Sequence, residues 1–190
     1  IDDNSRFGSF DTYRGTVAYA FGPAKLRASY GTGAKAPGLY QLFDPTYGNP
    51  NLGVQTSKGG DVGMDINLPG EMTAEITYFF GSKRNEIAFD GSIPPFGGYT
   101  QYGRTRADGI EVGLSARPFP WLTLRQTYTY IDHETDTDED GVYTDSGRPK
   151  YIATSSVTLE PIERASITAR VRFRDGDASG FGGDTASYTI

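Results

Sequence analysis

The chain is dominated by segments in which apolar and polar residues alternate. In Ala165–Arg174 the odd positions are Ala, Ile, Ala, Val and Phe, and the even positions are Ser, Thr and three arginines. Successive side chains of a strand point to opposite faces, so this period predicts a strand with one apolar and one charged face. Such a strand fits a soluble sandwich or barrel with a dry core. It fits equally a transmembrane barrel with its apolar face in lipid and its arginines toward a watery lumen.

The same alternation predicts eight further strands, each bounded by Gly, Pro or polar residues. They lie at residues 16–21, 25–30, 61–68, 72–80, 110–117, 122–130, 151–159 and 187–190. Tight turns near residues 23, 69, 119 and 161 alternate with long loops at about 33–56, 90–98 and 132–147. Short turns at one end and long loops at the other are typical of outer-membrane barrels, whose long loops are extracellular. Soluble sandwiches usually have shorter strands and lack this asymmetry.

We therefore predict an all-β fold, an antiparallel up-and-down transmembrane β-barrel. We expect residues 1–190 to form part of one outer-membrane barrel domain, with about nine of its strands. If Ile167 faces lipid, Arg170 and Arg172 face the lumen, whereas each would cost about 2–4 kcal/mol at the lipid midplane. Aromatic residues lie where membrane-interface girdles are expected: Tyr78, Phe80, Trp121, Tyr128 and Tyr130. Amphipathic strands of a soluble barrel are the alternative.

Composition narrows the class further. The chain has no run of about 18 apolar residues, so it contains no transmembrane helix. Its 13 Tyr, 11 Phe, one Trp and 25 Gly favour a turn-rich all-β protein, and the absence of cysteine excludes disulfides and thiol chemistry. The net charge of −6 weighs against nucleic-acid partners. The only histidine, His133, is expected on a surface loop with no nucleophile specified beside it, so we predict no enzymatic activity.

The acidic loop offers a tentative calcium site and no required cofactor. Asp136, Asp138 and Asp140 copy the first half of an EF-hand calcium loop, but its twelfth position is Gly147 rather than Glu and no helices flank it. Asp145 could complete an oxygen-ligand shell for Ca²⁺. A solvated acidic loop is the alternative, which the incomplete match favours.

Aromatic residues in the other predicted loops are candidate ligand contacts. They could form an apolar docking surface for a bulky ligand, or they could pack the loops against one another. The candidates are Tyr40, Phe43, Tyr47, Tyr99 and Tyr102.

Residues 29–52, SYGTGAKAPGLYQLFDPTYGNPNL, resemble the barrel of TonB-dependent outer-membrane receptors. In that family a strand ending S-Y-G-x-x-x-K-A-P precedes a loop ending G-N-P-x-L. Family members often continue with P-E-K-S and then Y-E-x-G, and residues 54–63 of this chain match these motifs only in part. Weaker matches follow in order: a G-I-E-V strand at 109–112, W-L-T-L at 121–124 and R-P-K at 148–150.

The resemblance implies an active transporter. Its members have a 22-stranded barrel closed by an N-terminal plug that contacts TonB, so this chain would hold roughly strands 12 to 20, without plug or remaining strands. The overall sequence pattern is most similar to that of cobalamin receptors, with siderophore receptors next. The implied partners are outer-membrane lipid, a metal chelate and the TonB complex, in the bacterial outer membrane. The expected lumen- or plug-facing residues are Asp65, Glu75, Arg125, Arg170 and Arg172. A passive porin or small structural barrel is the alternative.

Overall fold

In the computed structural model of the 190-residue chain, the described residues are 2–136, 140–146, 148–162, 164–175 and 187–189. Apart from the short helix α1, the elements are strands. Their bounds are β1 (Asp2–Asn4), β2 (Gly8–Phe10), β3 (Arg14–Phe21), β4 (Ala24–Lys35), α1 (Leu39–Phe43), β5 (Gln55–Leu68), β6 (Met72–Asp90), β7 (Gly98–Phe119), β8 (Leu122–Asp136), β9 (Thr144–Asp145), β10 (Tyr151–Ile162), β11 (Ala165–Arg174) and β12 (Ser187–Thr189). Among these elements no helix is long and apolar enough to cross a membrane.

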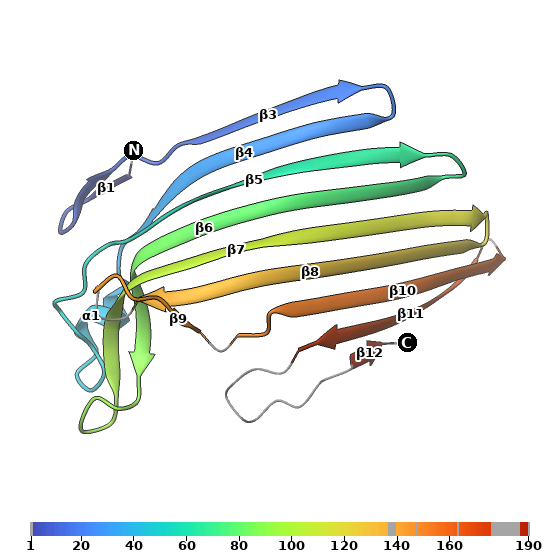
Figure 1. Cartoon of the computed structure of the whole chain (residues 1–190). Coiled ribbons are helices and arrows are strands. Elements are labelled where there is room, and N and C mark those ends of the chain that lie inside the picture. The colour runs from blue at the N-terminus through green and yellow to red at the C-terminus, as the bar shows by residue number, and fades with distance from the viewer. Residues whose placement is uncertain (1, 137–139, 147, 163, 176–186, 190) are drawn as a thin grey trace.

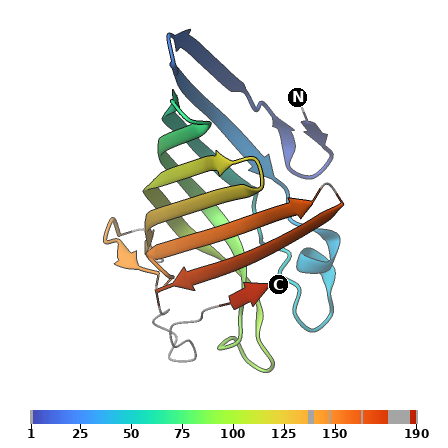
Figure 2. The same ribbon diagram turned by 90° about the vertical axis from the view of Figure 1, so that its right-hand side faces the viewer.

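The described strands form a ten-stranded antiparallel sheet beside a separate hairpin of β1 and β2. The order is β3-β4-β5-β6-β7-β8-β10-β11-β12, so successive long strands are neighbours, and β9 pairs with the end of β8. Figure 1 shows the strands side by side, with long connections at one end and tight turns at the other. Within the described residues β3 and β12 do not pair with each other, and Figure 2 shows the sheet curling into an open trough. The predicted all-β up-and-down sheet is confirmed.

The tight turns lie where the sequence places Gly and Pro. Gly22 and Pro23 join β3 to β4, and residues 69–71 join β5 to β6. Gly22 and Gly70 have φ values of 55° and 81°, which a residue without Cβ adopts without strain. Such short connections force neighbouring strands to pair directly and fix the end of each hairpin.

The register converts the alternation of each strand into rows across the sheet. One face carries an apolar row made of Tyr19, Leu26, Met64, Ile76, Val112, Tyr128, Ala153 and Phe173. The other face carries a polar row made of Lys25, Asp65, Glu75, Gly113, Thr127, Thr154 and Arg172. A slip of one residue would exchange the two faces of a strand, so this pattern specifies the pairing.

The apolar face has the character of a membrane surface. Ile76 and Val112, near its middle, are 46% and 43% exposed. A soluble monomer rarely exposes an apolar patch that extends across so many strands, whereas lipid covers it favourably. Aromatic contacts border this face toward both ends of the strands: Tyr30 with Phe80, Tyr130 with Tyr151, and at the tight turns Phe119 with Trp121. Aromatic girdles on both sides of an apolar band are typical of outer-membrane barrels.

The loop end of the sheet differs from the sequence prediction. β6 and β7 continue about ten residues further than predicted, so Tyr99 and Tyr102 lie in a strand and not in a loop. The predicted loop at 33–56 contains α1, and β8 extends to Asp136, which places His133 in a strand as well. Beyond the membrane neither face of a hairpin has to be uniformly apolar. The alternation therefore fades while the backbone pairing continues.

Substituting one position on each face of β6 tests the assignment of the faces. In the full-length protein reconstituted in lipid, we expect Ile76→Arg to lower the free energy of unfolding by about 2–4 kcal/mol, because it places a charge in the hydrocarbon layer. Thr73→Arg, on the opposite face of the same strand, should change it by less than about 1 kcal/mol. Urea titration of vesicle-embedded protein measures both. Equal losses for the two variants would refute the assignment.

Candidate functional site

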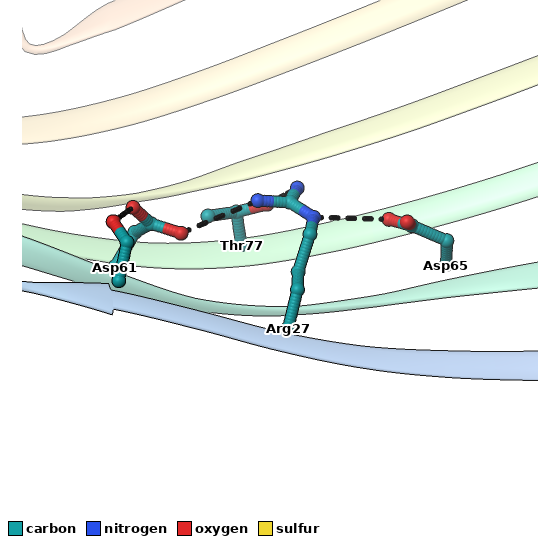
Figure 3. Close-up of polar contacts among 5 residues, drawn as sticks. Arg27, Asp61, Asp65 and Thr77 are labelled. Carbon is teal, nitrogen blue, oxygen red and sulfur yellow. Dashed lines mark hydrogen bonds and ion pairs between the residues drawn. The ribbon is translucent and has the colours of Figure 1, made fainter. Parts of the chain in front are cut away.

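The polar face is organised around Arg27 of β4 (Figure 3). Its guanidinium donates Nε to Asp65 Oδ1 at 3.2 Å and Nη1 to Asp61 Oδ2 at 3.3 Å, both on β5. Its Nη2 donates to Thr77 Oγ1 on β6 at 2.6 Å, and Ser29 donates to the other oxygen of Asp61. Each of its three nitrogens is bonded within the wall, and the guanidinium therefore joins three strands.

Two glycines on this face make room for long side chains to lie across the strands. A Cβ at Gly63 would come within 2.9 Å of both Arg27 Cζ and Thr77 Oγ1, so only glycine lets Arg27 cross β5 to reach β6. A Cβ at Gly113 would overlap the carboxylate of Glu75 on the adjacent strand. At these two positions the glycines let the long side chains of Arg27 and Glu75 lie close against the backbone of the neighbouring strand.

The register brings the predicted lumen residues onto one face. Asp65, Glu75 and Arg172 share one row across the sheet, while Arg125 and Arg170 both lie opposite Ser156 in the adjacent row. On this face the β5 carboxylates Asp61 and Asp65 pair with Arg27 of β4, further carboxylates lie on β6 and β7, and arginines lie on β8 and β11. That these residues contact a plug stays a prediction.

The connection at 36–54 is clamped onto the β6–β7 hairpin. The backbone N–H of Tyr99 donates to the carbonyl of Tyr47 at 2.9 Å, and Asn49 Nδ2 donates to the carbonyl of Tyr99 at 3.0 Å. The amide of Gln101 accepts from Gly53 N–H at 2.8 Å and donates to the Gly53 carbonyl at 2.9 Å. Leu42 and Leu52 of this connection are buried. A segment separated in sequence from the hairpin thus becomes a fixed part of the loop surface.

The aromatic candidates form a connected group at this contact. Tyr47 and Tyr99 each lie edge-on to Phe89 at 5.6 Å between ring centroids, and Tyr40 lies edge-on to Tyr99 at 6.1 Å. Tyr40 remains more than half exposed, as does Phe43, which lies under the guanidinium of Arg6. Tyr47 and Tyr99 therefore pack the loops against one another, whereas α1 exposes the rings of Tyr40 and Phe43. That these rings contact a ligand stays a prediction.

Tyr102 lies apart from that group, beside a cavity of about 380 Å³ at the loop end of β7 and β8. Glu86, Thr105, His133 and Arg148 line the same cavity. His133 is half-buried with its Nδ1 2.7 Å from Ser146 Oγ, so the prediction of a surface-loop histidine is wrong. The reason is that β8 continues to pair with β7 past the membrane boundary.

The residues of the predicted calcium site are dispersed. Asp136 is fully buried, and one of its oxygens accepts from Gly141 N–H at 3.1 Å. Asp140 accepts from Val142 N–H, and Asp145 lies 2.7 Å from Lys150 Nζ. The carboxylates of Asp145 and Asp132 raise the pKa of the Lys150 ammonium, so this cation stays charged and neutralises Asp145.

The described part of the chain holds no group of three or more acidic or histidine side chains suited to a metal. Asp138 lies outside the described residues. Calcium binding stays a prediction.

Sequence reasoning missed three residues that organise the site. Arg27 was visible only as one polar position of a strand, and its bonds depend on the register of three strands. Phe89 and Gln101 lie in the unpredicted extensions of β6 and β7. Residues 83–89, KRNEIAF, show no continued alternation, so the local sequence carried little signal for this extension.

The meander, the two-faced sheet and the long loops at one end define the wall of an outer-membrane β-barrel. The chain matches a family model described as "TonB dependent receptor-like, beta-barrel" over residues 1–190, and it belongs to the TonB-dependent receptor family. These proteins are transporters of the bacterial outer membrane and not enzymes, as the sequence predicted.

Solved structures share the fold. The siderophore receptor PirA from Pseudomonas aeruginosa has a TM-score of 0.73 and 21% identity, covering 98% of this chain and 33% of that one. A variant of the ferric enterobactin receptor PfeA from the same organism has a TM-score of 0.71 and 17% identity, covering 97% and 32%. The copper transporter OprC has a TM-score of 0.62 and 18% identity, covering 86% and 25%. This chain therefore spans about a third or less of the length of these proteins.

A matched pair of acid-to-amide substitutions tests the Arg27 cluster. Asp61→Asn removes a carboxylate that accepts from Arg27 and Ser29, and we expect the free energy of unfolding to fall by about 1 kcal/mol, since the groups are about one-third exposed. Glu75→Gln, on the same face without an ion pair to a described residue, should change it by less than half of that. Urea unfolding in lipid measures both, and an equal or larger loss for Glu75→Gln would contradict the cluster's role.

The loop clamp is tested by removing the amide of Gln101. Gln101→Ala deletes two hydrogen bonds to Gly53 and one to the Asn85 carbonyl. We expect amide hydrogen exchange across residues 49–54 to become about tenfold faster, because local opening loses its main restraint. Gln126→Ala, on the apolar face far from the loop, is the control. Unchanged exchange in Gln101→Ala would show that the ring contacts alone hold the loop.

Proposed function

We propose that this chain is part of the barrel wall and extracellular surface of a receptor that takes up a scarce metal chelate across the outer membrane. The first candidate ligand is a ferric siderophore, and the second is cobalamin or a similar corrinoid. The loops capture the chelate, and a plug segment coupled to TonB releases it inward. The protein supplies binding and a gated path, with no covalent chemistry on the ligand.

The aromatic surface of α1 carries this proposal. Leu39, Tyr40 and Phe43 are 76%, 57% and 58% exposed at the loop end of the sheet. Rings presented on a fixed segment suit a bulky chelate with flat or apolar surfaces, since stacking and edge contacts supply affinity. The clamp onto β6–β7 adds to this, because a pre-ordered loop loses less conformational entropy when the ligand binds.

The polar face supports the second half of the proposal. Its carboxylates on β6 and β7 and its arginines on β8 and β11 suit a folded occupant with complementary charges better than a freely diffusing solute. A plug would be such an occupant. Siderophores come first because PirA and PfeA are receptors for a siderophore and for ferric enterobactin, respectively. Corrinoids remain the second candidate ligand because the overall sequence pattern is similar to that of cobalamin receptors.

Uptake by cells that produce the full-length protein and lack their own receptors tests the proposal. We expect a ferric siderophore from a catecholate, hydroxamate and mixed panel to accumulate only when TonB is present. Cyanocobalamin accumulation instead would select the corrinoid candidate. Accumulation without TonB would indicate a passive porin and overturn the proposal.

The affinity of the same cells for the accumulated chelate locates the ligand surface. Tyr40→Ala with Phe43→Ala should weaken binding of the accumulated chelate about tenfold, because two exposed rings are lost. Val142→Ala, an exposed apolar residue in another loop, is the matched control. Equal affinities of the double variant and the control would place the ligand elsewhere.

A further inference from the structure

The cavity of about 380 Å³ at the loop end lies where β9 folds back on β8 (Figure 1). The register of β7, β8 and β9 places Thr105, Thr135 and Thr144 in one row of hydroxyl groups along it. Thr105 and Thr135 are even numbers of positions from Gly113 and Thr127, so this row belongs to the polar face. The volume is near the lower end of the range of ligand pockets, about 300–1,000 Å³, and suits one arm of a larger ligand.

A histidine and a serine beside this row form a hydrogen-bonded pair. His133 Nδ1 lies 2.7 Å from Ser146 Oγ, and Ser146 N–H donates to the His133 carbonyl at 3.1 Å. Burial and the charge of Arg148 lower the pKa of His133, so the imidazole is neutral at pH 7. If Ser146 donates to Nδ1, the Nε2–H of His133 is not used within the pair, and if Nδ1–H donates, the serine hydrogen is not used. Either tautomer therefore leaves one donor for a ligand.

The charges that line the cavity sum to one excess cation. Glu86 is paired with Lys83 at 3.1 Å, and Asp145 with Lys150 at 2.7 Å. Burial would raise the pKa of Glu86, but its bond to Lys83 and the charge of Arg148 lower it overall. Arg148 is exposed and forms no ion pair or side-chain hydrogen bond with another residue that the structure describes. Because both carboxylates already have a lysine, the arginine favours an anionic ligand.

We infer that this cavity binds a carboxylate arm of the chelate, with Arg148 as its charged contact. The inference rests on the proposed function, because it takes the bound group to belong to the chelate. A guanidinium binds a carboxylate through two parallel charge-assisted hydrogen bonds. The pair of His133 and Ser146 supplies a further donor, and so does the hydroxyl of Tyr102, which also lines the cavity. Chelates whose anionic oxygens all coordinate the metal would leave this site unused.

Titration of the full-length protein with iron-free citrate, in uncharged detergent, tests the site by ligand-observed NMR. We expect Arg148→Gln to bind citrate at least about tenfold more weakly than wild type, because a bidentate charge-assisted contact is lost. Arg148→Lys should lose about threefold, since it keeps the charge but not the planar fork. The matched control is Arg84→Gln, which removes an exposed arginine of β6 outside the cavity and should bind like wild type.

Four results would overturn the inference: no citrate binding by wild type, equal citrate affinities of wild type and Arg148→Gln, binding of uncharged triethyl citrate as tight as that of citrate, or equally tight binding of inorganic phosphate. Ser146→Ala provides a second variant that keeps the arginine. We expect it to lose about threefold, because the pair with His133 no longer holds a shared hydrogen. Heat-modifiable mobility confirms folding of every variant.

The uptake assay separates failure of this inference from failure of the proposed function. Arg148→Gln should weaken binding of a transported chelate with an uncoordinated carboxylate about tenfold and leave chelates without one unchanged. Uptake of a carboxylate chelate with the same affinity in wild type and Arg148→Gln would overturn the inference alone. Citrate binding that depends on Arg148, without TonB-dependent uptake of any chelate, would overturn the proposed function and leave the carboxylate site.

Discussion

The structure depends on the pairing register of a sheet whose two faces meet different surroundings. In a bilayer no water satisfies backbone groups, so each strand must bond to its neighbours along its whole length. Here tight turns join the hairpins at one end, and the register that follows keeps an apolar row in phase across β3 to β11. One slipped strand would place charged residues such as Arg172 in lipid. Membrane insertion and strand pairing thus select the same arrangement.

This coupling explains how much could be predicted from the sequence. Within the membrane a two-residue period is required, and Ala165–Arg174 shows it without exception, so strands, turns and faces could all be predicted. Beyond Phe80 the requirement disappears, and residues 81–90 and 98–109 continue the hairpin without a readable apolar face. The extent of β6 and β7 depends on loop packing instead. That packing involves the connection at 36–54, which no local pattern could assign to this hairpin.

The loop end shows how the missed contacts build a surface from short segments. α1 has five residues and would not be a stable helix by itself. Its position comes from burial of Leu42 and from hydrogen bonds of the following residues to Tyr99 and Gln101. The exposed rings of Tyr40 and Phe43 are therefore held by a strand pair whose lower half is anchored in the membrane. Loop rigidity and barrel stability are in this way physically connected.

The charged residues of the wall divide into those compensated within it and those that are not. Arg27 uses all three guanidinium nitrogens on its own sheet, and its neighbours Asp61 and Asp65 are compensated by it. Glu75 on the same face, and Arg84 with Arg104 on the other, are aligned by the same register but lack partners in the described residues. A charge that the register fixes but does not neutralise costs free energy until something outside the sheet compensates it. On the polar face that compensation would come from the lumen occupant that we propose. Strand pairing thus determines which charges of the described wall are neutralised within it and which are not.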